Sequence, residues 1–128
     1  MLRRLVFSLV FCSSTLLFAN EPCPEVNQIK IHEFTNVRSD PQNNYWEASI
    51  LGKDFGTELS WDFLIGIFPI DFLKTMDERE QAYLAMQSLQ LQRVEQNNAF
   101  QICFYTTNFK NINAVAITQI GGYLRSTT

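Results

Sequence analysis

The stretch Phe100-Gln101-Ile102-Cys103-Phe104-Tyr105 decides the fold. Its large apolar and aromatic residues predict a strand. Past the first twenty residues, the chain holds one other cysteine, Cys23, which is followed by Pro24. Two cysteines in an exported chain most simply form one bridge. We therefore expect a Cys23–Cys103 disulfide that ties the start of the mature domain to its C-terminal third.

Other chemistry for this cysteine pair fits the sequence poorly. No Cys-x-x-Cys motif is present, and the two positions lie far apart in sequence, which disfavours a redox-active pair. Two cysteines and the single histidine do not complete a standard four-ligand zinc site without a carboxylate. The sequence therefore predicts a structural bridge, no metal site and no cofactor.

Residues 1–20 have the pattern of a secretory signal peptide. Arg3 and Arg4 form a positive start, an apolar run follows, and Ala19 stands where cleavage is expected. Cys12 would leave with this segment. An uncleaved anchor is the alternative, but the run is shorter than the roughly 20 residues of a membrane span. The bulky Phe11 before Cys12 disfavours a lipoprotein. We expect an exported, periplasmic or secreted protein with no stable membrane anchor after cleavage.

Charge and composition narrow the class of protein. The chain carries a formal net charge of −3, and loss of the two arginines leaves −5. This acidic balance argues against nucleic-acid binding and against attachment to an anionic membrane by charge alone. Hydrophobic content is 46% and aromatic content 13%, enough for an aromatic core. Residues 21–128 suit one small domain. No Asn-x-Ser/Thr triplet occurs, which favours a bacterial source.

Periodicity predicts a mostly β domain. Alternation at 29–32 predicts a first strand, and residues 38–44 read as a polar turn. In the apolar segment 59–68, Trp61, Phe63, Ile65 and Ile67 would share one face, with Leu64 and Phe68 on the other. Thr75 and Glu78 fit a capping box at the start of one helix, 75–89. The remaining strands are expected near 45–51, 89–94, 100–105 and 114–120.

These elements predict an α+β fold. We expect a small, mostly antiparallel sheet of about six strands, with one helix packed on it and one disulfide. The alternative is a β-sandwich with a lateral helix.

No catalytic motif stands out among the polar residues. His32, beside Glu33, is a candidate general base with Ser49, Ser60 or Ser88 as nucleophile, but no nucleophile-elbow spacing accompanies these serines. The carboxylates that might supply a glycosidase pair have no selective spacing, and surface or turn positions explain them better. They are Glu47, Asp54, Glu58, Asp62 and Asp71. We therefore predict no catalytic residues.

Aromatic residues offer the best candidate binding surface. Tyr45, Trp46, Trp61 and Phe68 are of the types enriched at interfaces. In a domain of this size such residues are more often core. A small sheet with apolar residues on both faces lacks cover for one of them, which motivates the hypothesis of an exposed patch or a dimer seam.

The pattern Cys23-Pro24, Ile29, Trp46 and Ile102-Cys103-Phe104-Tyr105 resembles a family of small exported bacterial domains of unknown function. These domains carry Cys-Pro at the mature N-terminus, a mid-chain Trp and a late aliphatic-Cys-x-Tyr strand. The resemblance implies a disulfide-bonded periplasmic or secreted domain, often from intracellular Gram-negative bacteria. It supplies no catalytic residues.

Taken together, the sequence favours a non-enzymatic exported binding module with a protein or glycan partner. Two alternatives stay open. One is a small secreted hydrolase that uses His32 or a carboxylate pair. The other is a periplasmic hydrolase inhibitor that presents the loop Arg38–Asn44 to its target.

Overall fold

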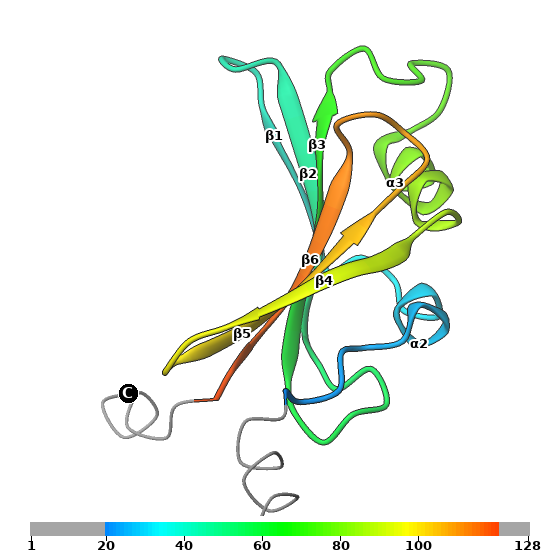
Figure 1. The fold of residues 1–128 in the computed structure, drawn as a ribbon. Helices are drawn as coiled ribbons and strands as arrows, with labels where there is room; N and C mark the ends of the chain where they lie inside the picture. The colour runs from blue at the N-terminus through cyan, green and yellow to red at the C-terminus, as the bar shows by residue number, and fades with distance from the viewer. Residues whose placement is uncertain (1–19, 121–128) are drawn as a thin grey trace, which may run out of the picture.

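The computed structural model describes residues 20–120, and the expected signal peptide lies almost wholly outside this range. The described residues form one six-stranded antiparallel sheet and two helices (Figure 1). The predicted α+β class is confirmed, and the single sheet excludes the sandwich. The elements are α2 Val26–Lys30, β1 Asn36–Asp40, β2 Tyr45–Lys53, β3 Trp61–Pro69, α3 Glu78–Met86, β4 Gln90–Gln96, β5 Phe100–Thr106 and β6 Asn113–Gln119.

The sheet consists of two three-stranded meanders joined at its centre. The strand order is β1-β2-β3-β6-β5-β4, and every neighbouring pair is antiparallel. Each meander follows a helix in the chain, α2 before β1 and α3 before β4. The β3–β6 ladder, from the pair Trp61–Thr118 to the pair Gly66–Asn113, joins the two halves.

Both helices cover the same face of the sheet, which we call the covered face (Figure 1). Ile29 of α2 and Ala82, Ala85 and Met86 of α3 belong to one core cluster with the strand residues. The strand residues in this cluster are Trp46, Ala48, Ile50, Trp61, Phe63, Ile65, Phe68, Cys103, Tyr105, Ala114 and Ala116. Their alternation along each strand explains why one face is buried and the other is not.

An irregularity in β3 corrects the predicted face of Phe68. The register passes from Trp46–Phe68 to Ala48–Ile65, so β3 has one extra residue there. Because a one-residue slip reverses the direction of all following side chains, Phe68 joins the covered face and Ile67 turns outward. The prediction that Ile67 shares the face of Trp61, Phe63 and Ile65, with Phe68 on the other face, was therefore wrong for these two residues.

The predicted first strand at 29–32 was also wrong, because Val26–Lys30 is helical. Val26 and Ile29, three residues apart, both pack on the core, whereas Ile31 is 72% exposed. This is the spacing of one helical turn, and two isoleucines at a spacing of two are too short a pattern to exclude it. The polar segment 38–44, expected to be only a turn, begins inside the edge strand Asn36–Asp40, which was not predicted, so the total of six strands is unchanged.

The predicted main helix is confirmed, but it starts later than expected. Asp77, not Thr75, is the N-cap, and its carboxylate accepts a hydrogen bond from the Glu80 backbone N–H at 2.9 Å. This hydrogen bond lowers the pKa of Asp77. Asp77 and Glu80 have the same three-residue spacing as Thr75 and Glu78, so the sequence offered two overlapping caps.

The Cys23–Cys103 disulfide is present and joins residues 80 positions apart. Its Cα–Cα distance of 6.0 Å is usual for a disulfide. Cys103 is fully buried in β5, and Cys23 immediately precedes the buried Pro24. The bond therefore attaches the segment before α2 to the middle of the second meander.

Replacing both cysteines, Cys23→Ala with Cys103→Ala, should lower the free energy of unfolding by about 4–5 kcal/mol, because the open chain gains loop entropy when it unfolds. Urea denaturation of the two proteins measures the difference. Reductant should destabilise the native protein to a similar extent and leave the double variant unaffected. A loss below about 1 kcal/mol would contradict a major structural role for this bond.

Candidate functional site: the disulfide region and the two faces of the sheet

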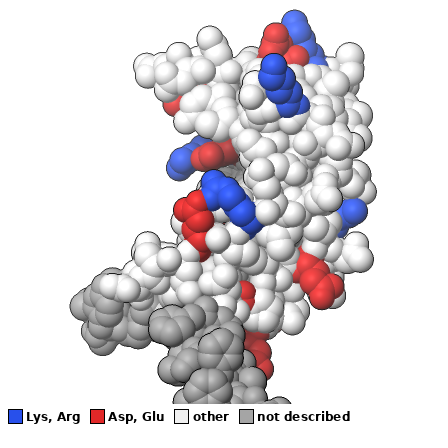
Figure 2. Space-filling model, viewed as in Figure 1, with Lys and Arg blue, Asp and Glu red and all other residues white. Residues whose placement is uncertain are grey.

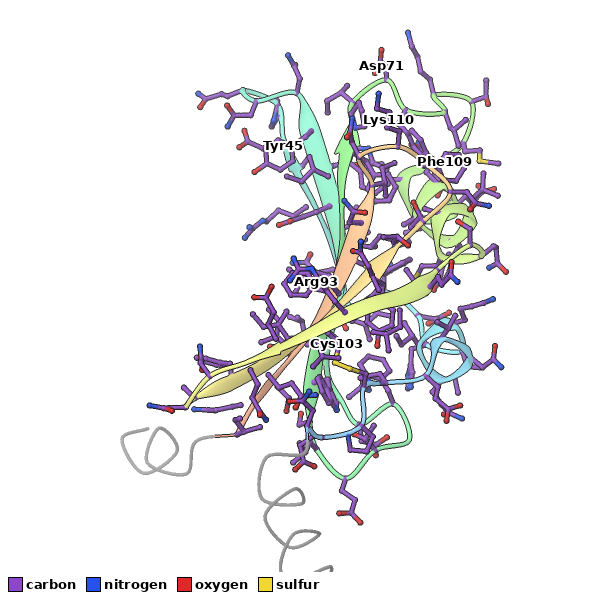
Figure 3. All side chains as sticks on the ribbon, in the orientation of Figure 1. Tyr45, Asp71, Arg93, Cys103, Phe109 and Lys110 are labelled. Atoms are coloured by element: carbon purple, nitrogen blue, oxygen red, sulfur yellow. A yellow bond between two sulfur atoms is a disulfide. The ribbon has the colours of Figure 1, made fainter. Side chains whose placement is uncertain are left out.

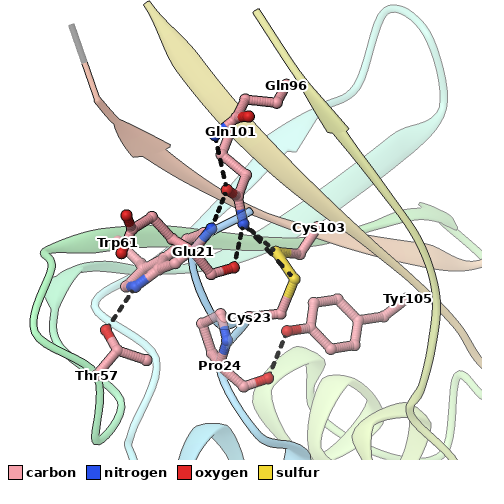
Figure 4. Close-up of a disulfide and its surroundings, with 9 residues drawn as sticks. All are labelled: Glu21, Cys23, Pro24, Thr57, Trp61, Gln96, Gln101, Cys103 and Tyr105. Carbon is pink, nitrogen blue, oxygen red and sulfur yellow. Dashed lines mark hydrogen bonds between the residues drawn. A yellow bond between two sulfur atoms is a disulfide. The ribbon is translucent and has the colours of Figure 1, made fainter. Parts of the chain in front are cut away.

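A buried glutamine fixes the N-terminal segment beside the disulfide (Figure 4). The Gln101 side-chain amide donates to the Glu21 carbonyl oxygen at 2.7 Å and accepts from the Glu21 backbone N–H at 2.9 Å. Gln96 Nε2 also donates to Gln101 Oε1 at 3.2 Å. The Gln101 amide thus makes the same pair of hydrogen bonds to the Glu21 backbone that a neighbouring strand would make. Both polar atoms of this buried side chain therefore have hydrogen-bond partners.

Tyr105 holds the next part of the same segment. Its hydroxyl donates to the Pro24 carbonyl oxygen at 2.5 Å, and the ring is buried (Figure 4). Burial raises the pKa of Tyr105 because it disfavours the charged tyrosinate. The sequence did not predict that Gln101 and Tyr105 hold the N-terminal segment, because a polar residue on a strand does not indicate which distant backbone group it will bind.

A cavity of about 480 Å³ lies next to this segment. It carries three carboxylates, Glu21, Glu25 and Glu58, and no basic residue lines it. Cys23 is also in the wall, but its sulfur is committed to the disulfide. Within residues 20–120, no group of three or more His, Cys, Asp or Glu side chains is arranged to hold a metal ion.

Three of the four residues expected to form an aromatic binding surface are enclosed. Trp46 is 1% exposed, Trp61 1% and Phe68 0%, so the expectation of an exposed surface was wrong for these side chains. They face the helices, where burial of large rings stabilises the core. Tyr45 is half-buried and alternates with Trp46, which places it on the opposite face (Figure 3).

His32 lies in the turn after α2, where its ring meets the edge of Phe55 at a centroid distance of 5.2 Å. In the described part of the chain it makes no hydrogen bond to Ser49, Ser60 or Ser88. The hydroxyl of Ser88 instead donates to the Ala85 carbonyl and accepts from the Asn108 backbone N–H. The structure does not bring the candidate base and nucleophiles together.

Three of the five candidate carboxylates have local structural partners. Glu47 pairs with Arg38 at 3.1 Å across β1 and β2. Asp54 accepts from the Gly56 backbone N–H at 2.9 Å, and Asp62 accepts from Gly52 at 2.8 Å. These contacts order turns and strand edges, while Glu58 and Asp71 are exposed in loops.

The loop proposed as an inhibitory element is the tip of the β1–β2 hairpin, at one end of the sheet (Figure 1). Asp40 orders this turn by accepting from the Asn43 backbone N–H at 3.3 Å and from Asn43 Nδ2 at 2.7 Å. Part of the expected loop, up to Asp40, is strand rather than loop.

No helix of residues 20–120 covers the second face of the sheet, which we call the open face (Figure 1). Its centre consists of half-buried apolar residues on β3, β6 and β5. They are Leu64, Val115, Ile117, Ile102 and Phe104. Leu64, Val115 and Phe104 are direct register partners across three strands. The sequence pattern predicted a second apolar face only for β3, because residues of single strands do not reveal which strands become neighbours.

Charged pairs border this apolar centre on both edge strands. Arg38 and Glu47 pair on β1 and β2, and Arg93 and Glu95 form an ion pair on β4. The Arg93 guanidinium also lies 3.8 Å from the centre of the Phe104 ring, a cation–π contact (Figure 3). In Figure 2, charged side chains of both signs lie in small groups on a largely uncharged surface.

Comparisons with protein-family models, curated proteins and solved structures found no match for this chain. In residues 20–120, neither helix has the length and apolar character needed to cross a bilayer.

Replacing Tyr105 with Phe should remove part of the alkaline destabilisation of the protein. The pKa of Tyr105 is higher in the folded protein than in the unfolded chain, so above about pH 10 the unfolded chain releases this proton while the folded protein keeps it. Deprotonation therefore favours unfolding, and the free energy of unfolding falls as the pH rises through this range. Urea unfolding between pH 8 and 11 measures the slope. Tyr105→Phe should be less stable than the native protein at pH 8, by about 1–3 kcal/mol for the lost Pro24 hydrogen bond, and should have a flatter profile. Parallel profiles would contradict this assignment.

Proposed function

We propose that the protein is an exported, disulfide-bonded, non-enzymatic binding module whose contact surface is the open face. The observation that carries this proposal is the uncovered row Leu64–Val115–Phe104, extended by Ile117 and Ile102. A contiguous apolar area on a small protein commonly marks an interaction site.

The chemistry of the open face favours a protein partner. Apolar central strands flanked by charged edge strands have the arrangement of an interface with an apolar core and a polar rim. The two edge pairs, Arg38–Glu47 and Arg93–Glu95, offer both signs of charge rather than one. A polyanion would need a basic surface, and a small molecule would need a deep concave site. The open face has hollows of about 260 Å³ beside Leu64 and Val115 and about 500 Å³ beside Ile117, and a mixed surface with such hollows suits the side chains of another folded protein.

Export belongs to the same proposal. A disulfide that closes most of the domain is compatible with an oxidising compartment, where such bonds persist. The basic and apolar pattern of residues 1–20 is typical of a secretory signal peptide, and the resemblance to small exported bacterial domains also supports export.

Two other functions have weaker support. A hydrolase would need the His32 imidazole or a carboxylate pair in a shared cleft, and the contacts of these residues are structural. An inhibitor has one observation in its favour, the ordered hairpin tip at Asp40–Asn44. That tip is a second candidate contact point, and the experiment below separates it from the open face.

The open face is tested by site-specific photo-crosslinking in exporting cells. A photoreactive residue at Ile117 should give a covalent adduct with one protein, whereas the same residue at the 72% exposed Ile31 or at Gln42 of the hairpin tip should not. Val115→Lys should weaken binding of that partner at least tenfold, because it places a charge in an apolar contact. The matched substitution Ile31→Lys should leave binding unchanged.

Several results would overturn the proposal. Adducts at Gln42 alone would favour the inhibitor. Glycan binding that Val115→Lys abolishes would replace the protein partner with a carbohydrate. A dimer in light scattering that Val115→Lys converts to monomer would assign the open face to self-association. Circular dichroism and thermal unfolding of each variant verify that its fold is retained.

A further inference from the structure

Two buried polar atoms without a hydrogen-bond partner lie near the start of α3. They are Trp46 Nε1, a donor, and Gln81 Oε1, an acceptor. Trp46 is 1% exposed and Gln81 is 4% exposed. Buried polar atoms are nearly always paired, and an unpaired one costs free energy. One donor and one acceptor left unpaired in the same region therefore call for an explanation.

Both side chains are held in place by their other contacts. The Trp46 ring stacks on Phe68 with centroids 4.0 Å apart and planes 9° apart. Gln81 Nε2 donates to the Met76 carbonyl oxygen at 2.7 Å, so this nitrogen is committed and the oxygen is the free end of the amide. The other tryptophan, Trp61, is satisfied, because its Nε1 donates to Thr57 Oγ1 at 2.8 Å. Of the two tryptophans, only Trp46 therefore has an indole N–H without a hydrogen-bond acceptor.

Trp46 and Gln81 border the same cavity, of about 370 Å³, between the β1–β2 hairpin and the start of α3. Ile70 and Met76 add apolar surface to its wall, and both are exposed. Lys74 contributes one positive charge, and Asp77 and Glu78 contribute two negative charges. The cavity therefore has apolar contacts and a net charge of −1 in its wall, and the two side chains that carry the unpaired donor and acceptor border it.

We propose that this cavity binds an amide group that carries an apolar substituent. The ligand carbonyl oxygen accepts from Trp46 Nε1, and the ligand N–H donates to Gln81 Oε1. Ile70 and Met76 contact the apolar substituent. A carboxylate offers no donor, and a protonated amine offers no acceptor, whereas an amide offers both on two separate atoms. A hydroxyl offers both on a single oxygen, and isoamyl alcohol in the experiment below tests that alternative; tighter binding of the alcohol than of either amide would overturn the proposal. A backbone amide of a peptide and a primary carboxamide share this chemistry.

The two polar atoms have almost no solvent-accessible surface, so a ligand reaches them by displacing a side chain at the cavity wall. Met76 is suited to this movement, because it is exposed and unbranched and changes rotamer easily. This site is separate from the open face, since Trp46 and Gln81 belong to the covered side of the sheet. The proposal is therefore independent of the proposed function.

The test follows the two indole N–H resonances in nitrogen–proton correlation spectra of the exported, disulfide-bonded protein. N-acetyl-leucine N-methylamide, the backbone-amide probe, should shift the Trp46 indole signal in a saturable manner, and isovaleramide tests the primary carboxamide as the source. The Trp61 signal is the internal control and should not move. N,N-dimethylisovaleramide, which has no amide N–H, and sodium isovalerate should bind more weakly than isovaleramide.

Substitutions identify the atoms involved. Trp46→Phe and Gln81→Met should each weaken binding of the better probe about threefold to tenfold, the range expected for one lost hydrogen bond. For Trp46→Phe, backbone amide resonances near Ile70 report binding. Gln87→Met is the matched control on the same helix, where Gln87 Nε2 donates to the Tyr83 carbonyl oxygen, and it should bind as the native protein does.

Three other outcomes would overturn the proposal. One is a strong water cross-peak at the Trp46 indole that persists with every probe, which would mean that resident water alone satisfies the pair. Another is equal binding of amide, dimethylamide and carboxylate, which would show apolar contact without recognition of the amide. The third is unchanged binding in folded Trp46→Phe and Gln81→Met proteins.

Discussion

The connection between Cys23 and β5 is the constraint on which the rest of the structure depends. The disulfide, the Gln101 amide and the Tyr105 hydroxyl all act on residues 21–24. Together they place α2 over the covered face, where Ile29 completes the core. A bond of this loop length accounts for a large share of the 5–15 kcal/mol stability of a typical small domain. The short helix α2, of five residues, would have little stability without this attachment.

Much of this architecture could be predicted because it depends on local pattern and on cysteine count. The strands Tyr45–Lys53 and Phe100–Thr106 and the disulfide were predictable in this way. The failures have specific causes. The extra residue in β3 changes the face of Phe68 through its pairing with β2, which no local pattern reveals. The helix at Val26 is too short for its periodicity to be distinguished from that of a strand.

The candidate sites were less predictable than the fold. The tryptophans suggested a binding surface, but Trp46 and Trp61 are core residues. The open face consists of four aliphatic residues and Phe104, which form an apolar area only because the sheet makes them neighbours. Its members come from β5 and β6, which are consecutive, and from β3, which is distant from both in sequence. The cavity at Trp46 depends on which polar atoms remain unpaired, and composition carries no information about that.

The position of the disulfide across the two meanders has a mechanical consequence. Cys23 lies before the first meander and Cys103 lies in the second. A force that pulls on the two ends of the folded region therefore passes from Cys23 to Cys103 through the disulfide. The covalent ring shields β1, β2, β3 and β4 from extension. Only β6 and the remainder of β5 can be stripped from the sheet while the sulfur link holds. At roughly 3.5 Å per extended residue, such stretching releases only a short tether. It also removes the β3–β6 ladder, so the two meanders then stay connected through the chain and the disulfide alone.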